Sequence, residues 1–340
     1  MGQPVTLAVT PPAHVRIDHY SAVHVAAAAA RALGAQCGLP GAMPDQAAVL
    51  ASELASNIDK HAKDGALYIQ PLPLSGGVEI LAADRGPGMP ELERCLADGY
   101  TTVGTLGAGL GAVRRIATCF SIRTQVGAGT YASARLVRPE QADAARQSAA
   151  LLCLPADLEE HCGDAGAVVD TGCIRTAAVI DGLGHGSEAA EAAQSALRSF
   201  RTAAAHPLPD VLNAMHRALR HTRGAAVGLL RLEGAQARYC GIGNVRAVAL
   251  SHEGVHHRLT GQPGVVGWRM PTPKTHSIAL PAGATALLHS DGIDARWTQD
   301  PSLFVLRLPP ELLTASVMHH HRNARDDAAV LAVRPHQRHL

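Results

Sequence analysis

Aromatic residues are scarce in this chain of 340 residues: Phe, Trp and Tyr together make up only 3% of it, although 47% of the residues are hydrophobic. The cores must therefore be built mainly from Ala, Val, Leu and Ile, which suits Ala-rich helices packed on sheets. Because single domains usually contain ~100–200 residues, we expect the chain to form two domains.

A marked excess of charge of either sign is also absent, since 30 Lys and Arg residues oppose 29 Asp and Glu residues, for a formal net charge of +1. This balance gives no electrostatic reason to expect a nucleic acid as partner. The 19 histidines are mostly scattered, and the cluster His319–His321 is better interpreted as a solvated helix end than as a metal-binding tract.

The seven cysteines are an odd number and no two have CxxC spacing, which argues against a disulfide scaffold or a structural zinc site and for a reducing compartment. The N-terminus lacks the basic region and apolar core of a signal peptide. The most apolar stretch, residues 22–33, is too short to cross a bilayer and contains His24 and Arg31. We therefore expect a cytoplasmic protein without a membrane partner.

A polar segment without apolar periodicity, residues 139–148, predicts a linker between a first domain at 1–138 and a second at 149–340. Both halves alternate strand and helix patterns, so the fold class is α/β. The first half predicts two short strands within 4–18 and further strands at 66–70, 77–83, 120–126 and 130–137. It predicts helices at 19–38, 44–63 and 90–97, and a last helix that is opened by the glycine-rich segment 104–111 and runs to about 118. The second predicts strands at 166–170, 174–181, 225–232, 236–241, 245–250, 284–290 and 328–333, and helices at 187–203, 208–221 and 309–320.

Polar side chains form one stripe on the predicted helix at 44–63, where Glu53, Asn57, Lys60 and His61 recur at helical spacing. Asn57 can offer a neutral oxygen to Mg²⁺, and Glu53 can accept a proton from an attacking hydroxyl group. Lys60 or His61 could meet phosphate oxygens. Taken alone, the stripe is better explained as a solvated helix face.

Two glycine-rich segments follow. Asp84 ends a strand that reads as buried, where a carboxylate can accept a hydrogen bond from an adenine amino group, and Gly86 and Gly88 let the backbone lie close to a base. The segment 104–111 leads into a helix and can bind an anion through backbone N–H groups, although it matches neither the P-loop nor the dinucleotide fingerprint. Its candidate nucleotide contacts are Thr105, Gly107, Gly109, Leu110 and Gly111.

In order and spacing, these three pieces resemble the N box, the Asp-x-Gly-x-Gly box and the glycine-rich lid of the GHKL (Bergerat) ATPases, over roughly residues 5–137. Thr130 resembles the threonine that supports the adenine-binding aspartate in that family. The resemblance implies an α/β sandwich, with one mixed sheet covered by helices, that binds ATP and Mg²⁺. Glu53 would then act as the catalytic base and Asn57 as the Mg²⁺ ligand.

Within that superfamily, residues 98–102 and the lid that follows look most like the switch serine/threonine kinases of the stressosome (RsbT type). Such kinases phosphorylate STAS-domain scaffold proteins. A related anti-sigma-factor kinase is the competing enzyme, and a partner-switching module in which ATP only shapes a binding surface is the alternative without catalysis.

Aspartates recur near strand ends in the second half, at Asp164, Asp181, Asp291, Asp326 and Asp327. Carboxylates at strand ends can converge on one rim of a sheet sandwich, where their oxygens would hold Mg²⁺ or Mn²⁺. Two such ions ~3.5–4 Å apart can activate a water for in-line attack on a phosphate. A single Asp-Gly pair, however, usually marks only a turn.

As an ordered set, the aspartates resemble the metal-dependent protein phosphatases of the 2C class in their compact bacterial form (SpoIIE and RsbX types), over roughly residues 149–335. The strongest element is Asp-Gly-x-Gly-His-Gly at 181–186, followed by an Ala-rich helix. The resemblance implies a β-sandwich flanked by helices. It also implies that Asp181 is catalytic and bridges two metal ions, with Gly182 (through its carbonyl), Asp164, Asp291 and Asp326 completing the ligands and Asp327 the less expected ligand of its pair.

The pattern also departs from that family. Ala165 and Gly166 stand where the family usually has acidic or aromatic residues. No arginine can be assigned to hold the substrate phosphate, and Arg175 is only a guess for that role. The resulting hypothesis is a bifunctional enzyme that phosphorylates and dephosphorylates STAS-domain scaffold or antagonist proteins. A downstream phosphatase or a sigma-factor regulator would be a further partner.

Overall fold

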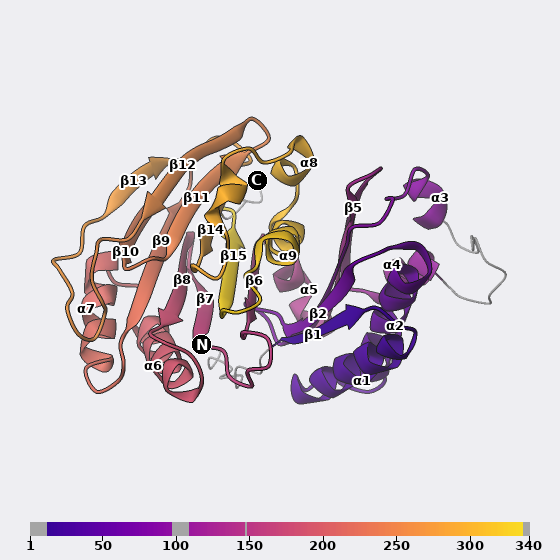
Figure 1. Ribbon diagram of the computed structural model, residues 1–340, viewed down its shortest axis with the longest axis horizontal. Coiled ribbons are helices and arrows are strands. Elements are labelled where there is room, and N and C mark those ends of the chain that lie inside the picture. Colours follow the sequence, from indigo (N-terminus) through magenta and orange to yellow (C-terminus); the bar gives the residue numbers. More distant parts are fainter. Residues whose placement is uncertain (1–11, 97–108, 147, 336–340) are drawn as a thin grey trace. The chain divides into compact units, whose positions relative to one another are not determined.

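The structure, a computed structural model, describes residues 12–96, 109–146 and 148–335, and the chain divides into two compact units, residues 1–147 and 148–340 (Figure 1). Each unit has its own sheets and its own helices, as the alternation of patterns predicts. Within the described residues, no helix combines the length and the apolar character needed to span a bilayer.

The first unit contains one five-stranded sheet in the order β1-β2-β3-β5-β4. Every strand pair in the described part of this sheet is antiparallel, so the mixed sheet expected from the resemblance is not observed there. Its elements are β1 (Ala13–Ile17), α1 (Ser21–Gln36), α2 (Met43–His61), β2 (Gly65–Pro71), β3 (Gly77–Asp84), α3 (Leu92–Leu96), α4 (Gly109–Ile116), β4 (Cys119–Gln125), β5 (Gly129–Val137), η1 (Pro139–Gln141) and α5 (Ala142–Ala145).

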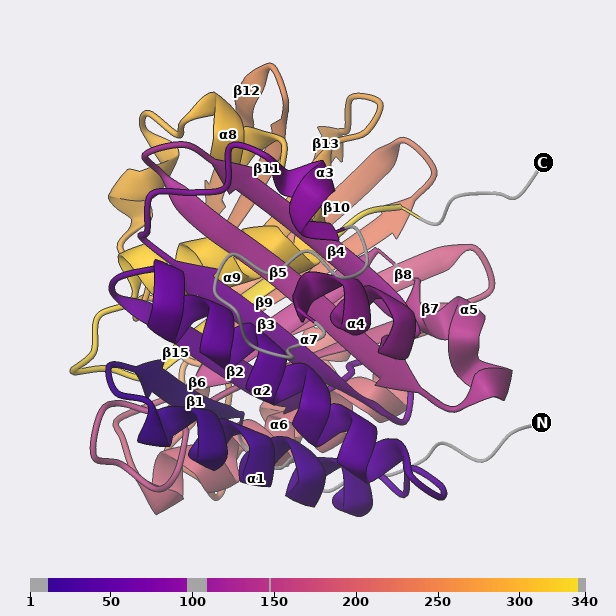
Figure 2. The same ribbon diagram turned by 90° about the vertical axis from the view of Figure 1, so that its right-hand side faces the viewer.

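Helices α1, α2 and α4 cover one face of this sheet, as Figure 2 shows. Alternate residues of β3, namely Val78, Ile80 and Ala82, join Leu50 and Leu54 of α2 in the buried core. Apolar residues recur at every second position of β3 and at helical spacing on α2. The two apolar faces therefore pack together in one layer. Small alanines on both helices let them lie close to the sheet, which explains how a core almost without aromatics is filled.

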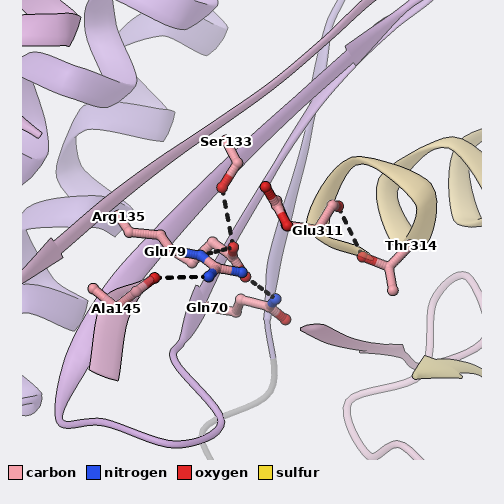
Figure 3. A network of polar contacts seen from close by, with 7 residues as sticks. All are labelled: Gln70, Glu79, Ser133, Arg135, Ala145, Glu311 and Thr314. Carbon is pink, nitrogen blue, oxygen red and sulfur yellow. Dashed lines mark hydrogen bonds and ion pairs between the residues drawn. The ribbon is translucent and has the colours of Figure 1, made fainter. Parts of the chain in front are cut away.

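The other face of the sheet carries a buried polar network (Figure 3). Glu79 accepts hydrogen bonds from Arg135 Nε at 2.6 Å, Ser133 Oγ at 3.0 Å and Gln70 Nε2 at 3.0 Å. Arg135 also donates to the carbonyl of Ala145 at 2.8 Å. Because Ala145 belongs to α5, the network ties the segment predicted as a linker to the first unit.

The second unit contains two five-stranded antiparallel sheets, in the orders β13-β10-β9-β8-β7 and β12-β11-β14-β15-β6. Helices α6 and α7 pack on the first sheet, and α9 packs on β6 and β15 of the second. The elements are β6 (Ala149–Leu154), β7 (Asp164–Thr171), β8 (Ile174–Gly182), α6 (Ser187–Ala203), α7 (Leu208–Ala218), β9 (Ala225–Glu233), β10 (Gln236–Ile242), β11 (Arg246–Ser251), β12 (Gly254–Thr260), β13 (His276–Ala279), β14 (Thr285–His289), η2 (Ala295–Thr298), α8 (Leu303–Leu306), α9 (Pro310–His321) and β15 (Ala328–Val333).

Arg175 ties together the two ends of this second unit. Its guanidinium group donates to both carboxylate oxygens of Asp170, each at 2.9 Å, and to the carbonyls of Ser148 and Arg334. The side chain is only 1% exposed. Arg175 is therefore a structural residue, and the guess that it could hold a substrate phosphate is wrong.

Candidate functional sites

Both sheets of the second unit contribute a carboxylate to one cleft of about 740 Å³. Asp181 lies near the end of β8, Asp291 follows β14, and Asp326 precedes β15. The structure thus brings together three of the predicted metal ligands, which are separated by up to 145 residues along the chain (326 − 181 = 145). The basic side chains that line the same cleft are His185 and Arg325.

Glycines are required where the chain turns from β8 into α6. A Cβ atom on Gly182 would lie 2.3 Å from the carbonyl oxygen of Ala189, and Gly184 has a φ of +90°. Only glycine adopts such backbone conformations without strain. The Asp-Gly-x-Gly-His-Gly segment therefore fixes Asp181 at the rim of the sheet while the backbone passes close to the first turn of α6.

The carboxyl groups of the cleft are held close to one another in a partly dry environment. Burial and the charges of Asp291 and Asp326 raise the pKa of Asp181 to about 8. Asn244 donates to Asp291 Oδ2 at 2.6 Å and also hydrogen-bonds Asp181. Like charges in such a setting favour either protonation or a cation.

Asp164 lies deeper. It pairs with Asp181 across β7 and β8, its side chain is buried, and its Oδ2 atom has no hydrogen-bond partner. Burial, followed by the charge of Asp181, raises the pKa of Asp164 well above its ordinary value, while a hydrogen bond from Ser290 opposes that rise. An unpartnered carboxylate oxygen beside this cluster has the donor chemistry that a hard divalent cation prefers.

As the side chains stand, no group of three or more His, Cys, Asp or Glu residues in the described parts of the chain is arranged to hold a metal ion. The cleft lining includes neither Asp164 nor Gly182. The residues nevertheless fit Mg²⁺ or Mn²⁺ by chemistry, because Asp181, Asp291 and Asp326 offer hard oxygens to one space and repel one another without a cation.

Asp327 has a different role from its neighbour Asp326. Its Oδ1 accepts a hydrogen bond from the backbone N–H of Ala156 at 2.8 Å, and its Oδ2 accepts one from Gly163 at 2.7 Å. Both carboxylate oxygens are therefore engaged in holding the loop between β6 and β7. We accordingly describe Asp327 as a positioning residue for this wall of the cleft, and no longer as a candidate ligand.

The first unit has a small, largely apolar cavity between α2 and the ends of β3 and β5. Six of the predicted nucleotide contacts line it: Asn57, His61, Asp84, Gly88, Leu110 and Thr130. Asp84 and Thr130 are direct partners in the register of β3 and β5. The three sequence pieces, which lie on α2, after β3 and on α4, therefore meet at one place.

Asp84 is nearly buried at the base of this cavity. Burial raises the pKa of its carboxyl group, and backbone N–H groups of Gly86 (2.7 Å) and Thr130 donate to it and lower the pKa in part. Gly88 has a φ of +76°, and a Cβ atom there would lie 2.4 Å from the carbonyl oxygen of Gln125. Asn57 has a buried Nδ2 atom without a hydrogen-bond partner, so the cavity wall contains an unsatisfied polar group.

The remaining predicted nucleotide residues do not line this cavity. Glu53 and Lys60 lie on α2, Gly86 follows β3, and Gly109 and Gly111 lie on α4. Thr105 and Gly107 lie outside the described residues, as do residues 98–102.

A sequence profile of the family described as Stage II sporulation protein E (SpoIIE) matches residues 175–336. The second unit is a SpoIIE-type domain. Phosphoserine phosphatase RsbX of Bacillus subtilis (strain 168) is 29% identical over 119 residues, which are 34% of this chain and 60% of that protein. A solved structure from work on the bacterial stressosome as a modular system is 30% identical in sequence, with a TM-score of 0.50. The match covers 55% of this chain and 98% of the chain in that structure.

A second curated relative is serine/threonine-protein kinase RsbT of Bacillus subtilis (strain 168), 42% identical over 81 residues, which are 23% of this chain and 61% of that protein. The chain therefore spans about three fifths of the length of each curated relative. The RsbX and RsbT relatives both agree with the resemblances drawn from the motifs.

Sequence reasoning missed several residues of the SpoIIE-type domain's cleft. Asn244 holds Asp291, Ser290 holds Asp164, and His185 Nδ1 lies 3.3 Å from Glu159 Oε1 of the opposite loop. Ser290 directly precedes Asp291 and could have been included with it. Asn244 follows the end of β10, and no motif in the surrounding sequence marks it. Only the fold shows that it lies in the cleft.

Proposed function

We propose that the SpoIIE-type domain is a metal-dependent protein phosphatase that hydrolyses phosphoserine or phosphothreonine. The observation that carries the proposal is the convergence of Asp181, Asp291 and Asp326, from both sheets, on one cleft. The RsbX relative, named a phosphoserine phosphatase, supports the same reaction class.

These three aspartates would hold Mg²⁺ or Mn²⁺, with Asp164 and the carbonyl of Gly182 as further proposed ligands. When bound, such ions act as Lewis acids and lower the pKa of water at the site. The chain's own residues orient the ligands: Asn244 fixes Asp291, and Ser290 fixes Asp164. Neighbouring hydrogen bonds of this kind are needed for metal affinity.

The test is hydrolysis of a phosphopeptide with Mg²⁺, with Mn²⁺ and with a chelator. We expect activity only with a metal, and a loss of at least about 100-fold in Asp291→Asn. Asp294→Asn is the matched control, because Asp294 is a nearby aspartate that pairs with Arg296 and does not line the cleft. Chelator-resistant hydrolysis would refute the metal-dependent mechanism.

We further propose that the first unit is a GHKL-type kinase that binds ATP with Mg²⁺ and phosphorylates Ser or Thr. Support comes from the six predicted contacts that share one cavity and from the RsbT relative. Asp84 would accept a hydrogen bond from the adenine amino group, Asn57 would bind Mg²⁺, and Glu53 would act as base. Thr130 would support Asp84 from the neighbouring strand.

Asn57→Ala should abolish transfer of radiolabelled phosphate while leaving phosphopeptide hydrolysis intact, and Gln46→Ala, at an exposed position of the same helix, is the control. Asp84→Asn should weaken ATP binding in calorimetry. Tight ATP binding without phosphate transfer by the wild type would instead favour a partner-switching module.

We propose STAS-domain proteins as the substrates of both units. The relatives include the kinase RsbT and the phosphatase RsbX, and a similar solved structure comes from work on the bacterial stressosome. Incubation with ATP and a STAS-domain protein, followed by mapping of phosphosites, tests the kinase half. The phosphorylated STAS-domain protein is then incubated with the chain and metal ion but without ATP. Loss of the same phosphate would show that the two units act in opposite directions. Binding to a sigma factor would favour an anti-sigma-factor kinase.

A further inference from the structure

Two exposed leucines line the aspartate cleft. Leu158 has a relative exposure of 105% and Leu183 one of 40%, and both belong to the cleft lining. They come from different loops, between β6 and β7 and between β8 and α6. A single exposed leucine is ordinary, but two that converge from separate loops on the rim of a reactive cleft indicate a contact surface.

The backbone of Leu158 is strained, which makes its exposure more informative. Its φ is +74°, a left-handed conformation that is costly for a residue with a branched side chain. The neighbouring residues are held on both sides: Ala156 N donates to Asp327, Asp157 N donates to the carbonyl of Ala324 at 2.8 Å, and Glu159 N donates to the carbonyl of Ala156. Strain that the surroundings maintain in this way clusters at ligand-contact sites.

Acidic residues on the same rim restrict what the leucines can contact. Asp157 and Glu159 flank Leu158, and the cleft floor carries Asp181 and Asp291. The five acidic side chains of the cleft lining outnumber its basic side chains, His185 and Arg325, so an anionic lipid surface would be repelled. A small phosphate ester could reach the floor without touching both leucines, whereas a protein segment would pass over the rim.

We propose that Leu158 and Leu183 contact an apolar side chain directly next to the phosphorylated residue of the protein substrate. This inference rests on the proposed phosphatase activity and adds the substrate's local sequence to it. The leucines thus determine specificity, while the aspartates perform the chemistry.

The experiment compares two phosphopeptides that differ only in having Leu or Ser beside the phosphoserine, with p-nitrophenyl phosphate as a small substrate. The wild type should prefer the Leu peptide. Leu158→Ser and Leu183→Ser should each lower kcat/KM for that peptide by about tenfold, as expected for one lost apolar contact. Hydrolysis of p-nitrophenyl phosphate should not change.

Two further variants separate recognition from folding. Leu158→Gly suits the positive φ, so it should fold at least as well and still lose the preference for the Leu peptide. Leu303→Ser is the matched control, since Leu303 is 63% exposed on α8 and does not line the cleft. If the wild type is active but hydrolyses both peptides at equal rates, only this inference is overturned. A wild type inactive on all three substrates would overturn the proposed function with it.

Discussion

Replacement of Asp327 by alanine should destabilise the SpoIIE-type domain strongly. The change removes the acceptors of two backbone N–H groups, those of Ala156 and Gly163, and leaves both without a partner. An unpaired buried polar group costs about 1–3 kcal/mol, so we expect the free energy of unfolding to fall by about 2–6 kcal/mol. Against a total of ~5–15 kcal/mol, such a loss is large. Asp327→Asn retains one acceptor oxygen and should lose about half as much.

Tryptophan fluorescence during denaturant unfolding measures this directly, because the only two tryptophans of the chain, Trp268 and Trp297, lie in the second unit. Asp326→Asn is the paired control. Burial, followed by the charge of Asp291, raises the pKa of Asp326, so removal of this charge should leave stability unchanged or raise it while hydrolysis falls. If Asp327→Ala unfolds within ~0.5 kcal/mol of the wild type but loses metal-dependent activity, Asp327 is a ligand and the reasoning is refuted.

Two other predictions concern charge. The pKa of Asp181 is about 8 in the folded, metal-free domain and ~3.9 for an ordinary Asp, so the folded state binds this proton more tightly and its contribution to stability is lost as the pH rises from 4 to 8. Fluorescence melts with a chelator should therefore show a lower Tm at pH 8 than at pH 5, and saturating Mn²⁺ should reverse the order; a flat profile would contradict the shift. Glu79→Gln should cost the first unit about 1.5–3 kcal/mol, because it removes the carboxylate that accepts a charge-assisted hydrogen bond from Arg135 Nε. Glu91→Gln, in an exposed pair with Arg94, should cost under ~1 kcal/mol, and circular-dichroism melts of both variants measure the difference.

Long periodic segments were predictable from the sequence. The helix predicted at 44–63 is α2, Met43–His61, and the strand predicted at 225–232 is β9, Ala225–Glu233. Helix α2 has an apolar face that repeats along its length, and β9 is a nearly continuous apolar run that is buried, so local pattern and tertiary burial agree. Asn57 lies on α2 and Asp181 lies near the end of β8, so both candidate residues belong to elements that the sequence predicts.

Three edge strands, β6, β12 and β13, were not predicted from the sequence, whereas the edge strands β4 and β7 were. Strands β12, Gly254–Thr260, and β13, His276–Ala279, have half-exposed or polar residues and gain their conformation by pairing with β11 and β10. Strand β6, Ala149–Leu154, is a short apolar run directly after the polar segment, and its partner is β15. For β6 and β13 the strand partner is distant in sequence, whereas β12 pairs with the adjacent β11 but its polar sequence has no apolar period that would reveal it.

The pair Asp326 and Asp327 marks the limit of motif reasoning at the site. Two adjacent carboxylates at the start of a strand have equal chemistry, and the motif offers both as ligands. Both carboxylate oxygens of Asp327 accept backbone hydrogen bonds, so only one residue of the pair lines the cleft. The structure assigns that place to Asp326 and turns Asp327 towards the loop that carries Leu158. Because Asp326 lines the cleft and Asp327 holds the loop of the proposed substrate contact, a substitution at either position should impair the domain. Measuring unfolding and metal-dependent hydrolysis separately distinguishes the two roles, because Asp327→Ala should lower stability whereas Asp326→Asn should lower hydrolysis without lowering stability.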